Sequence, residues 1–252
     1  MPEPRRSPEQ LARGPNGGVP DAGKVWQGVP TMCFSAEADL ATGVIVSAIG
    51  IDAVRHARTP RELPLAALPL VFGAHQLVEV LVWWGLAGKV SASLSDVATW
   101  VYLAIAFALP FWVPVAVRGV EPDRRRRTAM TLFAAVGLVV TIVLLGSLVR
   151  GPVAASIQSH HIAYVLGIPA GAAISMLYVV ATCGALLTAS DRWIRSFGIA
   201  NLMAVVVLVW LTVDGFASLW CVWAAVTSIA IDRYLRDEDR DVGVVSDPIA
   251  ER

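Results

Sequence analysis

The sequence predicts an all-α, polytopic membrane protein with seven transmembrane helices, and two observations support that fold class. The first is composition: 56% of the 252 residues are apolar and 16% are charged, whereas about a quarter of an ordinary soluble domain is charged. The second is a series of apolar runs separated by loops, of which every second one is rich in arginine. The net charge of zero lacks the basic field of a nucleic-acid-binding domain, so we expect the lipid bilayer as partner and no nucleic acid.

Seven apolar runs approach the length of about 20 residues that a helix needs to cross the hydrocarbon core. They lie at residues 34–54, 63–87, 97–117, 128–149, 168–189, 195–213 and 216–233. The fourth run carries no charged residue, whereas the first carries Glu37, Asp39 and Asp52. Only Asp214 and Gly215 separate the last two runs, which predicts a tight helical hairpin between them.

Arginines are concentrated in alternate loops, and this pattern predicts the orientation of the chain. These arginines are Arg55, Arg58, Arg61, Arg118, Arg124, Arg125, Arg126, Arg127, Arg192, Arg195, Arg233, Arg236 and Arg240. The other loops hold only Lys89 and Arg150. Because positively charged loops stay in the cytoplasm, we expect the N-terminus outside and the C-terminus inside, in the plasma (inner) membrane.

Both ends of the chain lie outside the predicted bundle. Residues 1–31 are rich in proline, contain no apolar run, and are interpreted either as a disordered tail or as a mis-assigned start. The tail is basic and would have to be exported, and a start at Met32 removes this conflict with the charge rule. We therefore expect a seven-helix domain over residues 32–236, followed by a short charged cytoplasmic tail at residues 237–252.

The second span contains ionisable residues at a depth where the membrane makes them costly. Such a group near the bilayer centre costs about 2.5–3.5 kcal/mol on insertion scales. His75, Glu79 and Trp83 are four residues apart and therefore share one helix face, and Gln76 follows His75. That face is predicted to look into the bundle. There these residues either hydrogen-bond neighbouring helices or serve as a ligand-binding, proton-relay or catalytic pair.

Further reactive side chains are predicted to gather on the outer side of the bundle. Asp214 lies in the outer hairpin and Trp220 begins the seventh span, so both join the predicted ligand-binding set. Zinc or copper would bind imidazole, carboxylate and thiolate groups, although the spacing here matches no metal-binding motif. The metal candidates are His75, Glu79, His160, His161, Cys33 and Cys221.

Other features have simpler interpretations. Ser35, Glu37 and Asp39 are interpreted as the N-cap and first-turn acids of the first helix. The only lysines, Lys24 and Lys89, lie outside the spans, which excludes a retinal Schiff base. The sequence contains no phosphate-binding loop and no HExxH or GxSxG motif.

Three short motifs resemble those of an uncharacterised bacterial family of multi-pass membrane proteins. They are Met32-Cys33-Phe34-Ser35-Ala36, His75-Gln76 with Glu79 and Trp83, and Ser218-Leu219-Trp220-Cys221 with Trp223-Ala224-Ala225. The resemblance covers about residues 32–236, and members of that family begin at Met-Cys-Phe-Ser. It implies the fold and the membrane location but no activity.

Three classes of function remain open. The first, which we favour, is a non-enzymatic membrane protein that binds or moves a small molecule through an outward-facing polar cavity lined by His75 and Glu79. The second is an intramembrane metal-dependent hydrolase of a lipid-like substrate, with His75, Glu79 and His160 or His161 as ligands. The third is a structural membrane scaffold without a ligand. The first is favoured because the polar residues are too sparse for a convincing catalytic site.

Overall fold

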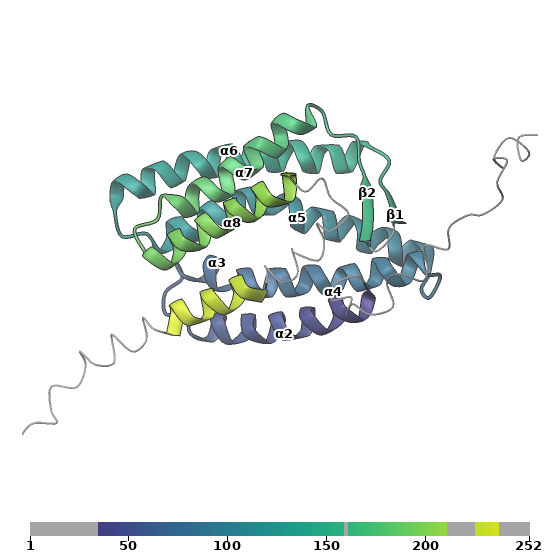
Figure 1. Cartoon of the computed structure of the whole chain (residues 1–252), viewed down its shortest axis with the longest axis horizontal. Helices are drawn as coiled ribbons and strands as arrows, with labels where there is room; N and C mark the ends of the chain where they lie inside the picture. Colours follow the sequence, from purple (N-terminus) through teal and green to yellow (C-terminus); the bar gives the residue numbers. More distant parts are fainter. Residues whose placement is uncertain (1–34, 159–160, 211–224, 237–252) are drawn as a thin grey trace, which may run out of the picture. The chain divides into compact units, whose positions relative to one another are not determined.

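A computed structural model describes residues 35–158, 161–210 and 225–236, and most of this part is helical (Figure 1). Its helices are α2 (Ala36–Arg55), α3 (Leu63–Ala66), α4 (Leu68–Leu86), α5 (Ala92–Val120), α6 (Arg124–Arg150), α7 (Gly171–Leu187), α8 (Arg192–Trp210) and a helix over residues 225–236. Helices occupy the described part of every predicted span, so the all-helical expectation for these segments is confirmed. The beginning of the seventh span lies outside the described residues.

Within the described residues, three segments are long and apolar enough to cross a membrane. They are Leu63–Leu86, which combines α3 and α4, then α5 and α6; α7 is a shorter apolar helix. Large apolar side chains also face outward, including Leu132 on α6 at 67% exposure and Met176 on α7 at the same value. Exposed apolar surface on this scale is unfavourable in water and favourable in lipid.

The predicted second span is divided into two helices. α3 ends at Ala66, Ala67 lies between the helices, and α4 begins at Leu68. Both helices carry a proline in their first turn, Pro64 in α3 and Pro69 in α4. A proline is tolerated at that position because the first N–H groups of a helix have no intrahelical acceptor.

Helices α2 and α4 lie side by side at a distance that glycine makes possible (Figure 1). A Cβ atom on Gly50 would overlap the backbone nitrogen of Leu70, and one on Gly73 would overlap the Ser47 hydroxyl. The two helices run antiparallel, because Gly50 near the end of α2 meets the beginning of α4. The N-terminal turns of α2 therefore lie beside the C-terminal turns of α4.

Helix α5 contains Pro110 and Pro114, and neighbouring helices pack against the carbonyls that these prolines leave without a helical donor. Pro110 has no N–H for the Ala106 carbonyl, and that oxygen accepts from the Tyr178 hydroxyl of α7 at 3.1 Å. Pro114 likewise leaves the Pro110 carbonyl without its helical donor, and that oxygen lies against Gly137 of α6. Neighbouring helices in this way make prolines tolerable inside apolar helices.

The connection between α6 and α7, expected to be a loop, contains a β-hairpin. Strands β1 (Ala154–Gln158) and β2 (His161–Val165) pair antiparallel, with Ser156 opposite Ala163. Ile162 of β2 packs with Val82 of α4 and Ala98 of α5. The hairpin therefore belongs to the packed structure and brings Tyr164 to the C-terminal half of α4.

Candidate functional site

Polar side chains from four elements meet in the interior of the bundle at α4. We call this group the α4 polar cluster: Asp39 from α2, His75, Gln76, Glu79 and Trp83 from α4, Tyr102 from α5, and Tyr164 from β2. The three central side chains are buried, with His75 6%, Gln76 2% and Glu79 7% exposed. The predicted inward-facing orientation of this face of α4 is therefore confirmed.

Asp39 belongs to this cluster and is more than a first-turn acid. It is 3% exposed, and its Oδ2 accepts a hydrogen bond from Trp83 Nε1 at 3.0 Å. Ser35 does cap α2, since its hydroxyl accepts from the Ala38 N–H at 3.3 Å. The interpretation of Asp39 as a residue that serves only the helix dipole was incomplete, because the packing of α2 on α4 turns this carboxylate inward.

Two tyrosines contact Glu79 and stack beside His75. The Tyr164 hydroxyl lies 3.5 Å from Glu79 Oε1, and Tyr102 also interacts with this carboxylate. The His75 and Tyr102 rings stack with centroids 3.9 Å apart, and the Tyr102 and Tyr164 rings follow at 4.8 Å. No lysine or arginine of the described residues forms an ion pair with Glu79.

Within the described residues, the cluster leaves several buried polar atoms without a hydrogen bond. They are Nδ1 of His75 and both Oε1 and Nε2 of Gln76. Buried polar groups are almost always satisfied, and leaving one unpaired costs about 1–3 kcal/mol. A bound molecule that supplies partners for these atoms would remove that cost.

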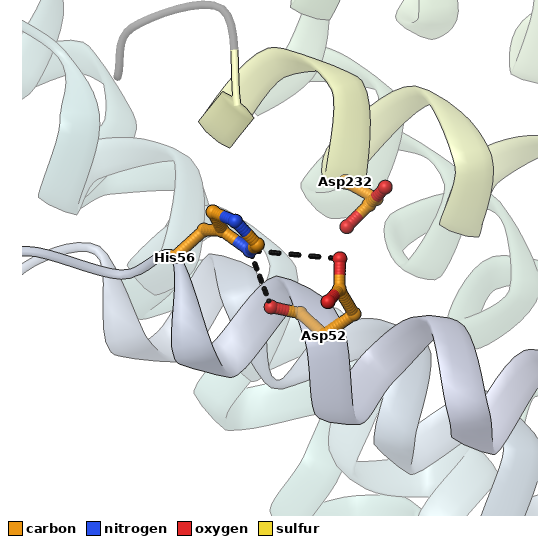
Figure 2. Close-up of side chains that lie close together, drawn as sticks. All are labelled: Asp52, His56 and Asp232. Carbon is orange, nitrogen blue, oxygen red and sulfur yellow. Dashed lines mark hydrogen bonds and ion pairs between the residues drawn. The ribbon is translucent and has the colours of Figure 1, made fainter.

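A second polar group links α2 to the helix at residues 225–236. Figure 2 shows Asp52 of α2 and His56, the residue that caps the end of α2, beside Asp232. One ligand-type atom from each lies within 4.8 Å of the others. His56 Nδ1 lies 2.9 Å from the Asp52 carbonyl oxygen and 3.5 Å from Asp52 Oδ2. Among the described residues this is the only three-residue group with the composition of a metal site.

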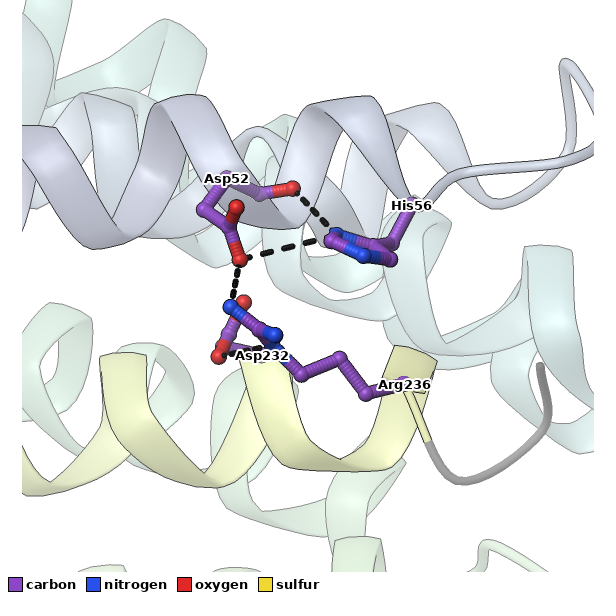
Figure 3. A network of polar contacts seen from close by, with 4 residues as sticks. All are labelled: Asp52, His56, Asp232 and Arg236. Atoms are coloured by element: carbon purple, nitrogen blue, oxygen red, sulfur yellow. Dashed lines mark hydrogen bonds and ion pairs between the residues drawn. The ribbon is translucent and has the colours of Figure 1, made fainter. Parts of the chain in front are cut away.

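The position between the two carboxylates is already taken by a cation. Figure 3 shows the Arg236 guanidinium, which donates to Asp52 Oδ2 and, through Nε at 2.9 Å, to Asp232 Oδ2. An arginine provides the positive charge that a metal ion would otherwise supply. We therefore interpret this group as an ion-pair link between the two helices and assign it no ligand.

An apolar cavity of about 110 Å³ lies between α3, α4, α5, α7, α8 and the 225–236 helix. The polar groups in its wall are hydrogen-bonded within the protein. The Tyr178 hydroxyl donates to the Ala106 carbonyl, and the Thr182 hydroxyl donates to the Tyr178 carbonyl. The Asn201 amide donates to the Cys183 sulfur. No residue of the α4 polar cluster lines this cavity. It offers little polar recognition, so the α4 polar cluster remains the better candidate site.

The sequence candidates divide into those that meet in this cluster and those that the structure does not describe. His75, Gln76, Glu79 and Trp83 all belong to the cluster. His161 is the first residue of β2, and nothing is described of its side chain. The remaining candidates, Cys33, His160, Asp214, Trp220 and Cys221, lie outside the described residues. The zinc or copper site and the hydrolase that depends on it therefore stay predictions.

Sequence reasoning missed Asp39, Tyr102 and Tyr164 as members of the cluster. A signal was present for the first two, because each is a polar residue inside an apolar run. Tyr164 carried no such signal, since it lies in a segment that was expected to be an outer loop.

Together, the fold and the cluster define a class of protein: a helical bundle with helices able to span a membrane and a polar group enclosed between them. The chain belongs to a family of unknown function (DUF6629), whose model matches residues 32–244. This match confirms membership of an uncharacterised family, whereas a bacterial origin and the Met-Cys-Phe-Ser start stay predictions. Comparisons with curated proteins and with solved structures found no match.

Proposed function

We propose that this chain is a multi-pass protein of the plasma membrane that binds or moves a small polar molecule at the α4 polar cluster. The observation that carries the proposal is the set of unpartnered atoms on His75 and Gln76, both of which are buried on α4, the helix that also carries the buried Glu79. Inside a bilayer no bulk water is available to satisfy such atoms. Ionisable residues within membrane segments commonly mark ligand or ion pathways.

The chemistry of the cluster favours a ligand that carries hydrogen-bond donors. Glu79 offers carboxylate oxygens, His75 one ring nitrogen, and Gln76 both a donor and an acceptor. The stacked rings of Tyr102 and Tyr164 form an aromatic wall beside these groups. A few convergent polar groups within an otherwise apolar and aromatic environment are typical of small-molecule sites.

The charge rule supports access from the outer side. It orients α4 with its Trp83 end outward, and the β1–β2 hairpin packs at that end through Ile162. Because His75, Gln76 and Glu79 are buried, we interpret this state as closed over the cluster. Entry of a ligand would then require the hairpin and α4 to separate.

Purification of the full chain in mild detergent, followed by denaturation and mass spectrometry of released molecules, tests the proposal. We expect one small molecule per chain, lost in Gln76→Met, which keeps the side-chain shape and removes the amide. Thr99→Val is the matched control, because this buried hydroxyl is already satisfied by the Ser95 carbonyl at 2.9 Å.

The melting temperature of Gln76→Met distinguishes an occupied cluster from an empty one. If a ligand is bound, the substitution removes its contacts and lowers the melting temperature. If the cluster is empty, the substitution removes an unsatisfied buried amide and raises stability by about 1–3 kcal/mol, which would contradict the proposal.

Metal analysis of the same sample tests the hydrolase alternative. Stoichiometric zinc or copper that is lost in His75→Ala would replace our proposal with a metal-dependent function. Wild-type stability in both His75→Ala and Glu79→Gln, without any released molecule, would instead leave the scaffold role.

A further inference from the structure

A basic pocket lies between the end of α5 and the beginning of α6, away from the α4 polar cluster. We call it the α5–α6 arginine pocket; it is lined by Arg118, Arg124, Arg127, Thr128, Thr131 and Leu132 and has a volume of about 390 Å³. Arg124, Thr128 and Thr131 share one face of α6 because they are spaced at four and three residues. Arg118 reaches the same pocket from α5.

The three arginines of the pocket have no carboxylate partner among the described residues. The two nearest acids in sequence are engaged elsewhere. Glu121 accepts from the N–H and hydroxyl of Ser190, and Asp123 caps α6 by accepting from the N–H groups of Arg125 and Arg126. The positive charge of the pocket is therefore not neutralised within the described protein.

One guanidinium of the pocket is held in place by Thr131. Arg118 Nε donates to Thr131 Oγ1 at 3.0 Å, and this hydroxyl in turn donates to the Arg127 carbonyl at 2.9 Å. The remaining N–H groups of Arg118 are left for an external acceptor. Planar guanidinium groups that converge on one pocket match the oxygen geometry of a phosphate group.

The position of the pocket on α6 relates this phosphate chemistry to the membrane surface. Leu132 lines the pocket and is 67% exposed, and the outward apolar residues Val139 and Ile142 follow along the same helix. The arginines thus lie where the exposed apolar surface of α6 begins, and the charge rule assigns this end to the cytoplasmic side. Phospholipid phosphates are found at that depth, and basic residues there attract anionic lipids.

We propose that the α5–α6 arginine pocket binds a phosphate group, supplied by an anionic phospholipid of the cytoplasmic leaflet. Arg118, Arg124 and Arg127 contact the phosphate oxygens, while Leu132 contacts the acyl chain below the headgroup. This site is separate from the α4 polar cluster and does not depend on the function proposed there.

Binding to the delipidated full chain in detergent micelles tests the proposal, with three probes added separately. The probes are phosphatidylglycerol, phosphatidylcholine and inorganic phosphate, and native mass spectrometry with melting temperature provides the readout. We expect saturable binding and a raised melting temperature with phosphatidylglycerol, at least about tenfold tighter than with phosphatidylcholine.

Two triple variants separate a specific pocket from general basicity. Replacing Arg118, Arg124 and Arg127 by Gln should weaken phosphatidylglycerol binding at least about tenfold. Replacing Arg125, Arg192 and Arg195 by Gln removes the same charge from exposed positions outside the pocket and should weaken it less than about threefold. The single variant Arg124→Gln provides the same test if the pocket triple does not fold.

Three results would overturn the assignment. Equal losses in the two triple variants would show a nonspecific basic surface. Equal binding of phosphatidylglycerol and phosphatidylcholine would remove the preference for an anionic lipid. Saturable binding of inorganic phosphate without binding of either lipid would assign the pocket to a soluble phosphate compound and overturn the lipid source.

Discussion

At the residue scale, the contact between Trp83 and Asp39 joins α4 to α2 inside the bundle. The indole N–H donates to a carboxylate that is 3% exposed. Trp83→Phe keeps most of the apolar ring and removes this donor, so we expect a loss of about 1.5–3 kcal/mol in the free energy of unfolding. Chemical unfolding in detergent measures it.

Trp84→Phe is the matched control for that prediction. Trp84 is the next residue on α4, is half-buried like Trp83, and has no side-chain hydrogen bond among the described residues. Equal destabilisation by Trp83→Phe and Trp84→Phe would show that the ring volume matters and the hydrogen bond to Asp39 does not.

Glu121 provides a pH-dependent contact outside the membrane-spanning helices. Burial opposes its ionisation, but hydrogen bonds from the Ser190 hydroxyl, the Ser190 N–H and the Asp123 N–H outweigh this and hold the pKa of Glu121 below its ordinary value of 4.5. A lowered pKa in the folded state stabilises the protein fully above pH 4.5 and loses this effect as the pH falls through the lowered pKa.

Glu121→Gln should therefore lower the melting temperature at neutral pH. It should also reduce the decrease in melting temperature that occurs as the pH is lowered. Melting curves between neutral and acidic pH measure both effects. Asp96 is an exposed acid that makes no hydrogen bond among the described residues. Asp96→Asn should therefore leave the decrease in melting temperature at acidic pH unchanged. If Glu121→Gln showed the same decrease in melting temperature at acidic pH as the wild type, the pH dependence would belong to other groups.

The α4 members of the candidate site were predictable because they lie on one helix, where a spacing of four residues is enough to place them on one face. Asp39 and Tyr102 were not assigned to the site, because their proximity depends on how α2 and α5 pack against α4. Tyr164 depends in addition on the β-hairpin. Single-helix periodicity contains no information about such contacts between elements.

At the scale of elements, the packing of α5 on α6 depends on the absence of a side chain at Gly137. A Cβ atom there would overlap the Pro110 carbonyl oxygen, which belongs to the backbone and cannot rotate away. We expect Gly137→Ala to lower the unfolding free energy by about 1–3 kcal/mol through a forced shift of the two helices. Chemical unfolding of the variant measures this loss.

Gly146→Ala is a control on the same helix. The nearest atom to its added Cβ would be Arg150 Nη1 at 3.8 Å, which is an ordinary contact at the end of a flexible side chain. Because alanine favours helix, this change should be neutral or stabilising by up to about 1 kcal/mol. A similar loss at both positions would show that the overlap with the Pro110 carbonyl is not the cause, which would contradict the prediction.

The helices were predictable as elements because each apolar run is longer than its loops and carries few charges. The division between α3 and α4 was not predicted, since residues 63–87 were interpreted as one continuous span. The β1–β2 hairpin was also missed: its strands are short, at Ala154–Gln158 and His161–Val165, and become stable only by packing on α4 and α5.

At the scale of the whole molecule, the orientation in the membrane is a prediction that rests on the alternating arginines. The segment Leu63–Leu86 offers the simplest test, because Pro60 and Ser93 are exposed positions on either side of it. If this segment crosses the membrane, the two positions lie in different compartments. The charge rule assigns Pro60 to the cytoplasm, beside Arg58 and Arg61, and Ser93 to the outside.

Single-cysteine labelling of spheroplasts with a membrane-impermeant maleimide distinguishes the possible arrangements. In a background with serine at Cys33, Cys183 and Cys221, Ser93→Cys should be labelled at once and Pro60→Cys only after the membrane is opened. The reverse pattern would mean that the bundle has the opposite orientation. The α4 polar cluster would then lie toward the cytoplasm and the α5–α6 arginine pocket at the outer leaflet. Labelling of both positions in intact spheroplasts would mean that Leu63–Leu86 does not cross, and the intramembrane cost that motivates a ligand for His75 and Gln76 would no longer apply.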